Sequence, residues 1–361
     1  MRAFPALLAS LPLAATLALP AAANQINTGG EKGAYHATFC PALEAELKKA
    51  KFDYTCTTSQ GSRENIRRVS GDASQVAFSQ FDVFELEMQA TGASDAYTLL
   101  RSDLARECIF MVTRNQEISN FGEVAALADQ LRFVLPPRNS GSAGTFEFLQ
   151  QIDPDGIGRA RDNITYADST EEAITRALSD DNTVALFVQF PDPKNERFST
   201  IGKEGGNIVP VIDRNILRQE VNGQKVYYAE ETEIELPKWN KSATKVVTAC
   251  TPMILITGTP ARIEDGNARK DQEDLIRTIE ALKAEDLQPQ TGFLASLWRK
   301  TKALSAKSVE KMVDVSEKAR EAAKPMMEKA MKRAKEMKQQ AEEAAGKLID
   351  KTQDGTSTDS N

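Results

Sequence analysis

Short apolar runs alternate with longer segments of helical periodicity from Asn24 to about Asp286. The apolar runs predict strands at Gln25–Thr28, Tyr54–Thr58, Val76–Ser79, Cys108–Thr113, Arg132–Leu135, Val184–Val188, Asn207–Ile212 and Val246–Gly258. Helical spacing predicts helices at Ala34–Lys51, Ser62–Val69, Gln80–Gln89, Gly122–Ala128, Gly144–Ile152, Thr170–Ser179 and Gln272–Lys283. This alternation indicates an α/β fold with a largely parallel sheet. The polar segment Lys225–Pro237 fits a hairpin or an edge addition better than a core strand.

The first 23 residues have the pattern of a secretory signal peptide. Arg2 supplies the positive end, Ala3–Leu19 is apolar, and Ala21 to Ala23 are the small residues of a cleavage site. A retained membrane anchor is the alternative, but Pro5, Pro12 and Pro20 weaken a continuous spanning helix. Asn24 follows the cleavage site, where a lipid-anchored protein would have cysteine. We therefore expect export of a chain without a lipid anchor.

Composition excludes several classes of function. The 361 residues carry a formal charge of −7, which disfavours a general binder of nucleic acid or anionic surfaces. With His36 as the single histidine, the chain offers no multi-histidine metal site. The four cysteines form no C-x-x-C pair, which argues against zinc ribbons and iron–sulfur clusters. We expect neither a metal nor a cofactor.

Cys40, Cys56, Cys108 and Cys250 can form two disulfides in an oxidising compartment. Three pairings are possible from the sequence, and buried free thiols are the alternative to each pair. A catalytic cysteine is disfavoured because His36 would have to be its partner.

Four predicted strands run into polar turns that open helices. The turns span Thr28–His36, Thr58–Ser62, Ser79–Gln80 and Pro136–Thr145. Glycine lets the backbone approach a ligand closely, and free N–H groups at a helix start favour an anion. Simple helix capping is the ordinary explanation of each turn alone, whereas four turns together indicate a binding cleft at the carboxyl ends of strands. None matches a P-loop or a dinucleotide-binding fingerprint.

The turn motifs resemble those of the TAXI family, the solute-binding subunits of a class of TRAP transporters. The resemblance rests on Thr28-Gly29-Gly30 with Gly33-Ala34-Tyr35; on Ser59, Gly61, Ser62 and Asn65 followed by Gly71, Ala77, Gln80 and Asp82; and on Ser140-Gly141-Ser142-Ala143-Gly144-Thr145. It covers about Asn24 to Asp286. The chain departs from the family at His36, where a second aromatic is common, and at Phe81, where serine is common.

The resemblance implies a type II periplasmic-binding-protein fold, in which two α/β lobes joined by two crossing strands close on a solute. Lobe 1 would comprise residues 24–107 and 250–290, and lobe 2 residues 108–249. Cys108 and Cys250 would lie side by side on the crossings, which favours the pairing 40–56 and 108–250. The implied location is the periplasm, and the implied partners are a small organic solute and membrane permease subunits.

The predicted ligand residues are Gly33, Tyr35, His36, Ser59, Gly61, Ser62, Gln80, Arg138, Ser140, Ser142, Gly144, Thr145 and Gln189. Helix N-termini at Gly33, Gly61 and Ser142–Thr145 suit a carboxylate, and Arg138 can pair with one bidentately. The ordinary alternatives are an aromatic at the lobe rim for Tyr35, and exposed loop side chains for Arg138 and Gln189. Asp82 is expected to brace its own helix.

Residues 296–350 form a charged amphipathic extension that lies outside the resemblance. From Ser296 onward the chain has 15 Lys and Arg against 11 Asp and Glu. Small apolar residues recur at helical spacing, and Pro325 should kink or divide the helix. A solvated helix or loose coiled coil, a membrane-surface helix around Trp298, and a partner-binding or self-associating helix all fit. Residues 351–361 are expected to be disordered.

Three functions compete. The first is an extracytoplasmic receptor that captures a small, carboxylate-bearing solute for a TRAP-type transporter. The second is an enzyme on the same fold, which the absence of a nucleophile–base pair disfavours. The third is a sensor or structural protein whose C-terminal helix docks a partner or the membrane surface. The first is the function we expect.

Overall fold

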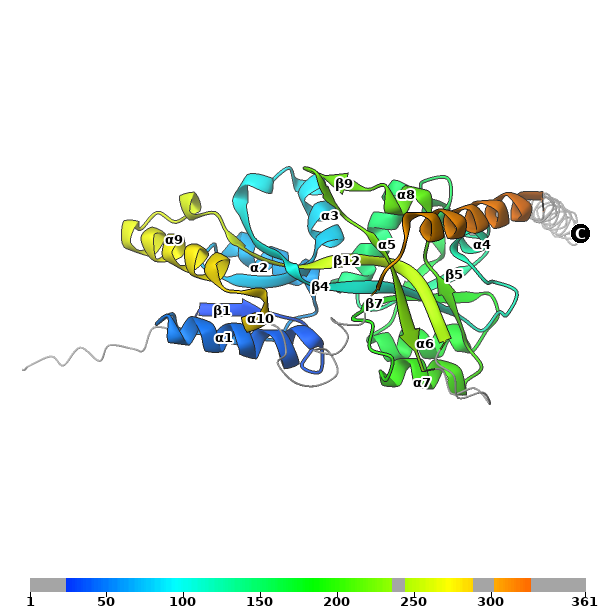
Figure 1. Cartoon of the computed structure of the whole chain (residues 1–361), viewed down its shortest axis with the longest axis horizontal. Helices are drawn as coiled ribbons and strands as arrows, with labels where there is room; N and C mark the ends of the chain where they lie inside the picture. The colour runs from blue at the N-terminus through cyan, green and yellow to red at the C-terminus, as the bar shows by residue number, and fades with distance from the viewer. Residues whose placement is uncertain (1–23, 236–243, 288–301, 326–361) are drawn as a thin grey trace, which may run out of the picture.

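The computed structural model describes residues 24–235, 244–287 and 302–325 and shows a two-lobe α/β protein (Figure 1). Two long strands, β4 (Tyr97–Thr113) and β12 (Thr244–Gly258), run side by side through both lobes. This is the two-lobe arrangement with two crossing strands that the resemblance implies. The predicted signal peptide, the segment around Trp298 and the chain beyond Pro325 lie outside the described residues.

Lobe 1 is the half of the molecule built on the first three strands. Its elements are β1 (Asn24–Asn27), the π-helical turn η1 (Tyr35–Phe39), α1 (Cys40–Lys49), β2 (Tyr54–Thr57), α2 (Ser62–Gly71), β3 (Val76–Gln80), α3 (Phe81–Thr91), η2 (Ser94–Ala96), η4 (Pro260–Arg262), α9 (Gly266–Ala281) and α10 (Ala284–Leu287). Both η1 and α1 fall within the single helix predicted there, and Pro41 occupies the first turn of α1, where a missing N–H costs nothing.

Lobe 2 is the half built on the later strands. Its elements are α4 (Phe121–Ala126), β5 (Arg132–Leu135), α5 (Gly141–Ile152), η3 (Ile157–Asn163), β6 (Ile164–Tyr166), α6 (Thr170–Leu178), β7 (Thr183–Gln189), α7 (Glu196–Lys203), β8 (Asn207–Pro210), α8 (Arg214–Leu217), β9 (Glu220–Val221), β10 (Gln224–Lys225) and β11 (Tyr228–Ile234). Because the crossing strands belong to both halves, the lobe boundaries at residues 107–108 and 249–250 stay a prediction.

The prediction of a largely parallel sheet is wrong, because the sheet is mixed. Its order is β2-β1-β3-β12-β4-β7-β5-β6. The outer pairs in each lobe are parallel. The crossing strands run antiparallel to each other, β12 is antiparallel to β3 and β4 is antiparallel to β7. A chain that crosses to the second lobe and returns must reverse its direction.

Alternate residues of the inner strands face different cores, as the period of two in a strand requires. Val76 and Phe78 of β3 pack with α1, whereas Ala77 packs with α2 and α3. In β4, Phe110 contacts the core of α6 and α7, and Met111 faces the opposite side. That opposite core is continuous between Ile66 in lobe 1 and Phe146 in lobe 2. The lobes are therefore packed against each other on this side.

Several element boundaries differ from the predictions. β4 begins at Tyr97 instead of Cys108, because charged residues hide the strand pattern of its first half. Helix α5 begins at Gly141, where Ser140 caps it, and α9 begins at Gly266, where Asp265 caps it. The predicted edge addition is present, since β11 pairs with β12 over seven residues.

The described part of the C-terminal extension contains a short strand and a helix. Strand β13 (Lys302–Ala303) pairs with β11, and residues 306–325 are helical. Figure 1 shows this helix, in orange, lying along lobe 2, with α8 near its start and α4 beneath it. Within the described ranges, no helix combines the length and apolar character needed to cross a membrane.

Candidate functional site

Three of the four predicted turns meet at the interface between the lobes. Gly61 has a positive φ of 125°, and a Cβ there would lie 3.2 Å from the amide nitrogen of Gly141. A Cβ at Gly141 would overlap the Gln80 side chain and lie 2.9 Å from the Ser62 hydroxyl oxygen. Glycine is needed here because the backbones of the two lobes approach each other directly. These three turns therefore lie together in direct contact with each other, and the prediction that they form a solute cleft stays a prediction.

Polar pairs surround these turns on the outside. Arg63 of α2 pairs with Glu147 of α5 at 2.6 Å, and Gln151 Nε2 donates to Gln89 at 2.7 Å. Asn139 Nδ2 donates to the Gln60 side chain at 2.8 Å. These contacts join lobe 1 to lobe 2 and hold the turns together.

A buried polar group lies beneath the turns, and we call it the interlobe cluster: Tyr35, Ser62, Gln80, Asp82, Glu107, Thr145 and Tyr227. Asp82 is its centre. One carboxylate oxygen accepts hydrogen bonds from Thr145 at 2.7 Å and from the Tyr227 hydroxyl at 2.8 Å. The other oxygen accepts from the amide of Val83 at 2.8 Å. Asp82 thus braces its own helix, as expected, and also binds lobe 2.

Glu107 on β4 is the second buried carboxyl of the interlobe cluster. The Tyr35 hydroxyl donates to it, and the Tyr35 ring stacks on Phe78. Burial raises the pKa of Glu107 to about 8, nearby Asp82 adds to this rise, and hydrogen bonds from Tyr35 and Gln80 oppose it. Burial also raises the pKa of Asp82. Near neutral pH Glu107 is therefore mostly uncharged.

The first predicted turn supports the second. Gly33 donates its N–H to Gly30, and a ring nitrogen of half-buried His36 lies 3.0 Å from the Thr28 hydroxyl oxygen. The Ser59 hydroxyl donates to Asn65 at 2.6 Å and accepts from Gly61 N–H at 3.0 Å. The N–H groups of Gly33 and Gly61 are therefore occupied within the chain. Phe81 is buried in the core shared by the lobes.

The predicted residues of lobe 2 are likewise engaged. Ser140 caps α5 through the N–H of Ala143, and Ser142 accepts from the N–H of Val188 at 2.9 Å. A Cβ at Gly144 would lie 2.9 Å from both methyl groups of Val83 in lobe 1. Exposed Arg138 stacks over the Tyr166 ring. Gln189 accepts from Arg197 at 2.8 Å, while its buried amide nitrogen has no hydrogen-bond partner among the residues that the structure describes.

A cavity of about 660 Å³ lies beside the interlobe cluster. Lobe 1 contributes Phe39, β4 contributes Ala105 and Arg106, and the rest comes from lobe 2 and residues 304–313. Tyr227 belongs to both the cluster and the cavity wall, and Phe190 in the wall packs against Tyr35. None of the predicted ligand residues is among the residues that line this cavity.

The cavity joins apolar surface to positive charge. Phe39, Phe190, Leu217, Tyr228, Val309 and Val313 supply apolar and aromatic surface. The charged lining residues are Arg106, Arg214, Arg218 and Lys225 against Glu230 and Glu310, an excess of cations in a chain whose net charge is −7. Arg106 pairs with Glu230 and stacks over Tyr228. Arg218 and Lys225 have no ion pair with any residue that the structure describes.

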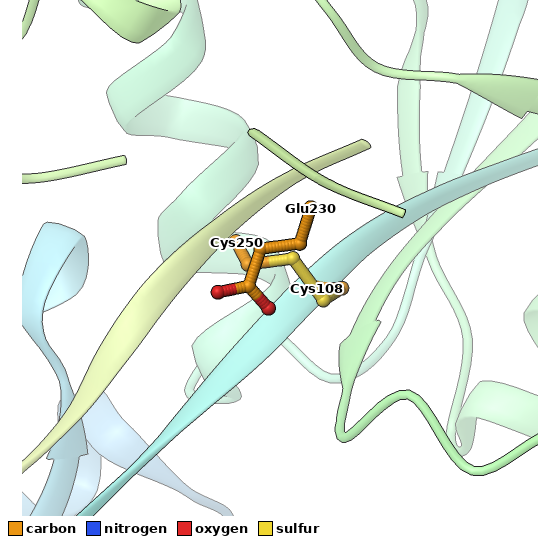
Figure 2. Close-up of side chains that lie close together, drawn as sticks. All are labelled: Cys108, Glu230 and Cys250. Carbon is orange, nitrogen blue, oxygen red and sulfur yellow. A yellow bond between two sulfur atoms is a disulfide. The ribbon is translucent and has the colours of Figure 1, made fainter. Parts of the chain in front are cut away.

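Both disulfides favoured under the resemblance are present, Cys40–Cys56 and Cys108–Cys250. The second joins the two crossing strands where Cys108 and Cys250 face each other in register. Figure 2 shows the Glu230 side chain lying over this disulfide, and the two sulfur atoms and a carboxylate oxygen all lie within 4.8 Å of one another. Since both sulfurs are bonded to each other, this group offers no thiolate ligand to a metal.

Sequence reasoning missed Arg106, Glu107, Arg218, Lys225 and Tyr227. Arg106 and Glu107 precede Cys108 in a stretch whose charges obscured the strand. Lys225 and Tyr227 fall in the segment predicted as a polar hairpin or edge addition, and Arg218 lies before it, outside every predicted element. The signal that marks this region is the pair Tyr227-Tyr228, which follows the basic residues Arg218 and Lys225. Nothing in the sequence pattern of a two-lobe fold predicts that residues 304–313 form part of the cavity wall.

No protein-family model matches the chain, and no curated protein matches it. Among solved structures, the second VFT domain of BvgS from Bordetella pertussis is similar at 12% identity, with a TM-score of 0.37, 73% of this chain and 90% of that chain covered. PstS from Borrelia burgdorferi is similar at 17% identity and a TM-score of 0.34, covering 73% and 95%. The periplasmic molybdate-binding protein of Azotobacter vinelandii gives 14% and 0.30, covering 73% and 95%. At these values the similarities say nothing about the solute or its site in this chain.

Proposed function

We propose that this protein is an extracytoplasmic solute receptor that captures a small carboxylate-bearing molecule between its lobes. The observation that carries the proposal is the cavity of about 660 Å³, whose wall comes from lobe 1, from β4 and from lobe 2. A solute that touches both lobes favours the arrangement in which they are together. The volume falls in the range of ordinary small-molecule sites.

The chemistry of the cavity supports an anion that carries an apolar body. Arg218 and Lys225 are free of ion pairs within the described ranges, and an arginine can hold a carboxylate by two parallel hydrogen bonds. Phe39, Phe190 and Tyr228 provide the apolar surface. The neighbouring interlobe cluster keeps the lobes aligned on one side while the cavity accepts the solute on the other.

The finer parts of the proposal rest on the sequence. The predicted signal peptide and the two disulfides fit an oxidising, extracytoplasmic compartment such as the periplasm. The TAXI-like turns support delivery of the solute to TRAP-type permease subunits. In this proposal Gly61, Gln80, Ser142 and the other predicted turn residues act by joining the lobes around the solute.

The test is a thermal-shift screen of the mature chain against small carboxylates, amino acids and sugar acids. A solute at about 100 times its Kd stabilises the folded state by about 2.7 kcal/mol, so a hit is a clear upward shift of Tm. Arg218→Ala and Lys225→Ala should each weaken the shift. Arg161→Ala and Lys203→Ala are the matched controls, because both are exposed cations outside the cavity.

Two outcomes decide the proposal. Equal losses in the cavity variants and in the controls would remove the cavity as the solute site. No shift with any compound would favour the sensor or structural role over transport.

A further inference from the structure

The helix over residues 306–325 forms part of the wall of the cavity. Val309, Glu310 and Val313 line the cavity, and Val313 is buried. The preceding residues Leu304 and Ala306 line it as well. A segment outside the two-lobe pattern therefore covers the proposed solute site.

This helix is seated on lobe 2 through Gly122 at the start of α4. The N–H of Gly122 donates to the Ser316 hydroxyl at 3.0 Å. A Cβ at Gly122 would overlap the backbone carbonyl of Ser316, and the three nearest atoms to it all belong to the helix. Only glycine allows this approach, so lobe 2 has a place fitted to the helix.

A buried ion pair forms a second part of the seat. Arg320 contacts Asp153 at 2.9 Å and lies 4.0 Å from Asp213, and both aspartate side chains are almost fully buried. Gly156 leaves room for this pair, since a Cβ there would overlap Asp153 and the Arg320 guanidinium. Two buried carboxylates without Arg320 would be poorly compensated, so the seat favours the docked helix.

The third contact links the helix to the charge of the cavity. Arg214, which lines the cavity, pairs with Asp314 at 3.3 Å and with Glu317 at 2.9 Å. These two carboxylates pair with the Arg214 guanidinium, a positive charge in the cavity wall beside Arg218 that an anionic solute would otherwise bind. Docking of the helix and binding of an anion therefore compete for the Arg214 guanidinium.

We propose that the helix over residues 306–325 is a gate of the cavity, which leaves its seat to admit the solute and to release Arg214. The inference rests on the proposed function of the cavity and adds its regulation. The gate is a segment of this chain. The pairing of β13 with β11 holds its N-terminal end, and the helix hinges there.

The test measures access to the cavity without any solute. Leu217→Cys places a reporter thiol in the wall, and its alkylation by iodoacetamide is followed with both native disulfides kept oxidised. Gly122→Ala is added to unseat the helix, and Gly71→Ala is the matched control because a Cβ there meets nothing within 4 Å. Hydrogen exchange over residues 306–325 reports on the helix itself.

With Gly122→Ala we expect the helix to lose its exchange protection and the thiol to react at least about tenfold faster, while β4 and β12 stay protected. Loss of protection without faster alkylation would overturn the gate.

Arg320→Ala is the second variant, should Gly122→Ala fail to fold. Unchanged helix protection in the variants that fold would also overturn the gate. Failure of the solute screen alone would contradict the receptor and leave this access measurement intact.

Discussion

The Tyr227 hydroxyl of lobe 2 donates a hydrogen bond of 2.8 Å to the Asp82 carboxylate of lobe 1, and both side chains are buried. Thr145 donates to the same oxygen at 2.7 Å. A single aspartate at the start of α3 therefore ties the lobes together beside the proposed solute cavity, because the Tyr227 ring is part of the cavity wall.

Tyr227→Phe should weaken this tie. The change removes one donor from a buried carboxylate, which costs about 1–3 kcal/mol of unfolding free energy. Urea denaturation of the variant measures the loss. Tyr97→Phe is the control, because the Tyr97 hydroxyl donates to the Ile66 carbonyl at 3.2 Å in a partly buried place. Equal losses in the two variants would contradict a special role for the pair of Asp82 and Tyr227.

Glu107 should make stability depend on pH. Its pKa is raised to about 8 in the folded protein by burial, above the ordinary value of 4.5. The folded state therefore binds the proton more tightly, so the contribution of Glu107 is complete below about pH 4.5 and is lost as pH rises to about 8. The loss amounts to roughly 3–5 kcal/mol across that interval.

Glu107→Gln removes this titration and keeps a group that can accept the Tyr35 hydroxyl. As pH rises from about 5 to about 8, the wild type should lose unfolding free energy and the variant should not. The variant should therefore become more stable relative to the wild type over this range. Denaturant titrations at several pH values measure it. A difference that stays constant over this range would show that Glu107 titrates normally.

The two disulfides should differ in how much they contribute to the unfolding free energy. They close chain segments of 142 residues for Cys108–Cys250 and 16 residues for Cys40–Cys56. On the chain-entropy account, removing the longer closure costs roughly 5 kcal/mol and removing the shorter one about 3 kcal/mol. Paired cysteine-to-alanine variants, compared by denaturation, measure both. A larger loss for the Cys40–Cys56 pair would contradict this ranking.

The fold could be predicted wherever residues carry their own local signal. Arg132–Leu135 forms a strand with the predicted bounds, because a short apolar run between turns has few alternatives. The strand starting at Tyr97 could not be found, since Arg101, Asp103 and Arg106 interrupt its apolar pattern. Those charges are tolerated because Arg101 pairs with Asp103 and Arg106 pairs with Glu230. The contact with Glu230 is one that only the tertiary structure supplies.

The candidate site was harder to predict than the fold. Glycine and serine turns mark the places where backbones come close, and the structure brings Gly61 and Gly141 together. The same sequence signal serves ligand binding and lobe contact, so it could not separate the two. The cavity wall around Arg218 and Val309 depends on how the C-terminal helix docks, which has no local signature.

Gly144→Ala should loosen the packing between the lobes. The added Cβ would lie 2.9 Å from both methyl groups of Val83, which is fully buried and stiff at its branched Cβ. Helices α3 and α5 must then move apart, at a cost of about 1–3 kcal/mol. Gly266→Ala is the matched comparison, because it is also a helical glycine and a Cβ there meets nothing within 4 Å. Small-angle scattering should show a larger radius of gyration for Gly144→Ala than for Gly266→Ala, together with a lower unfolding free energy. The same radius and stability in both variants would mean that the contact of Gly144 with Val83 does not hold the lobes together.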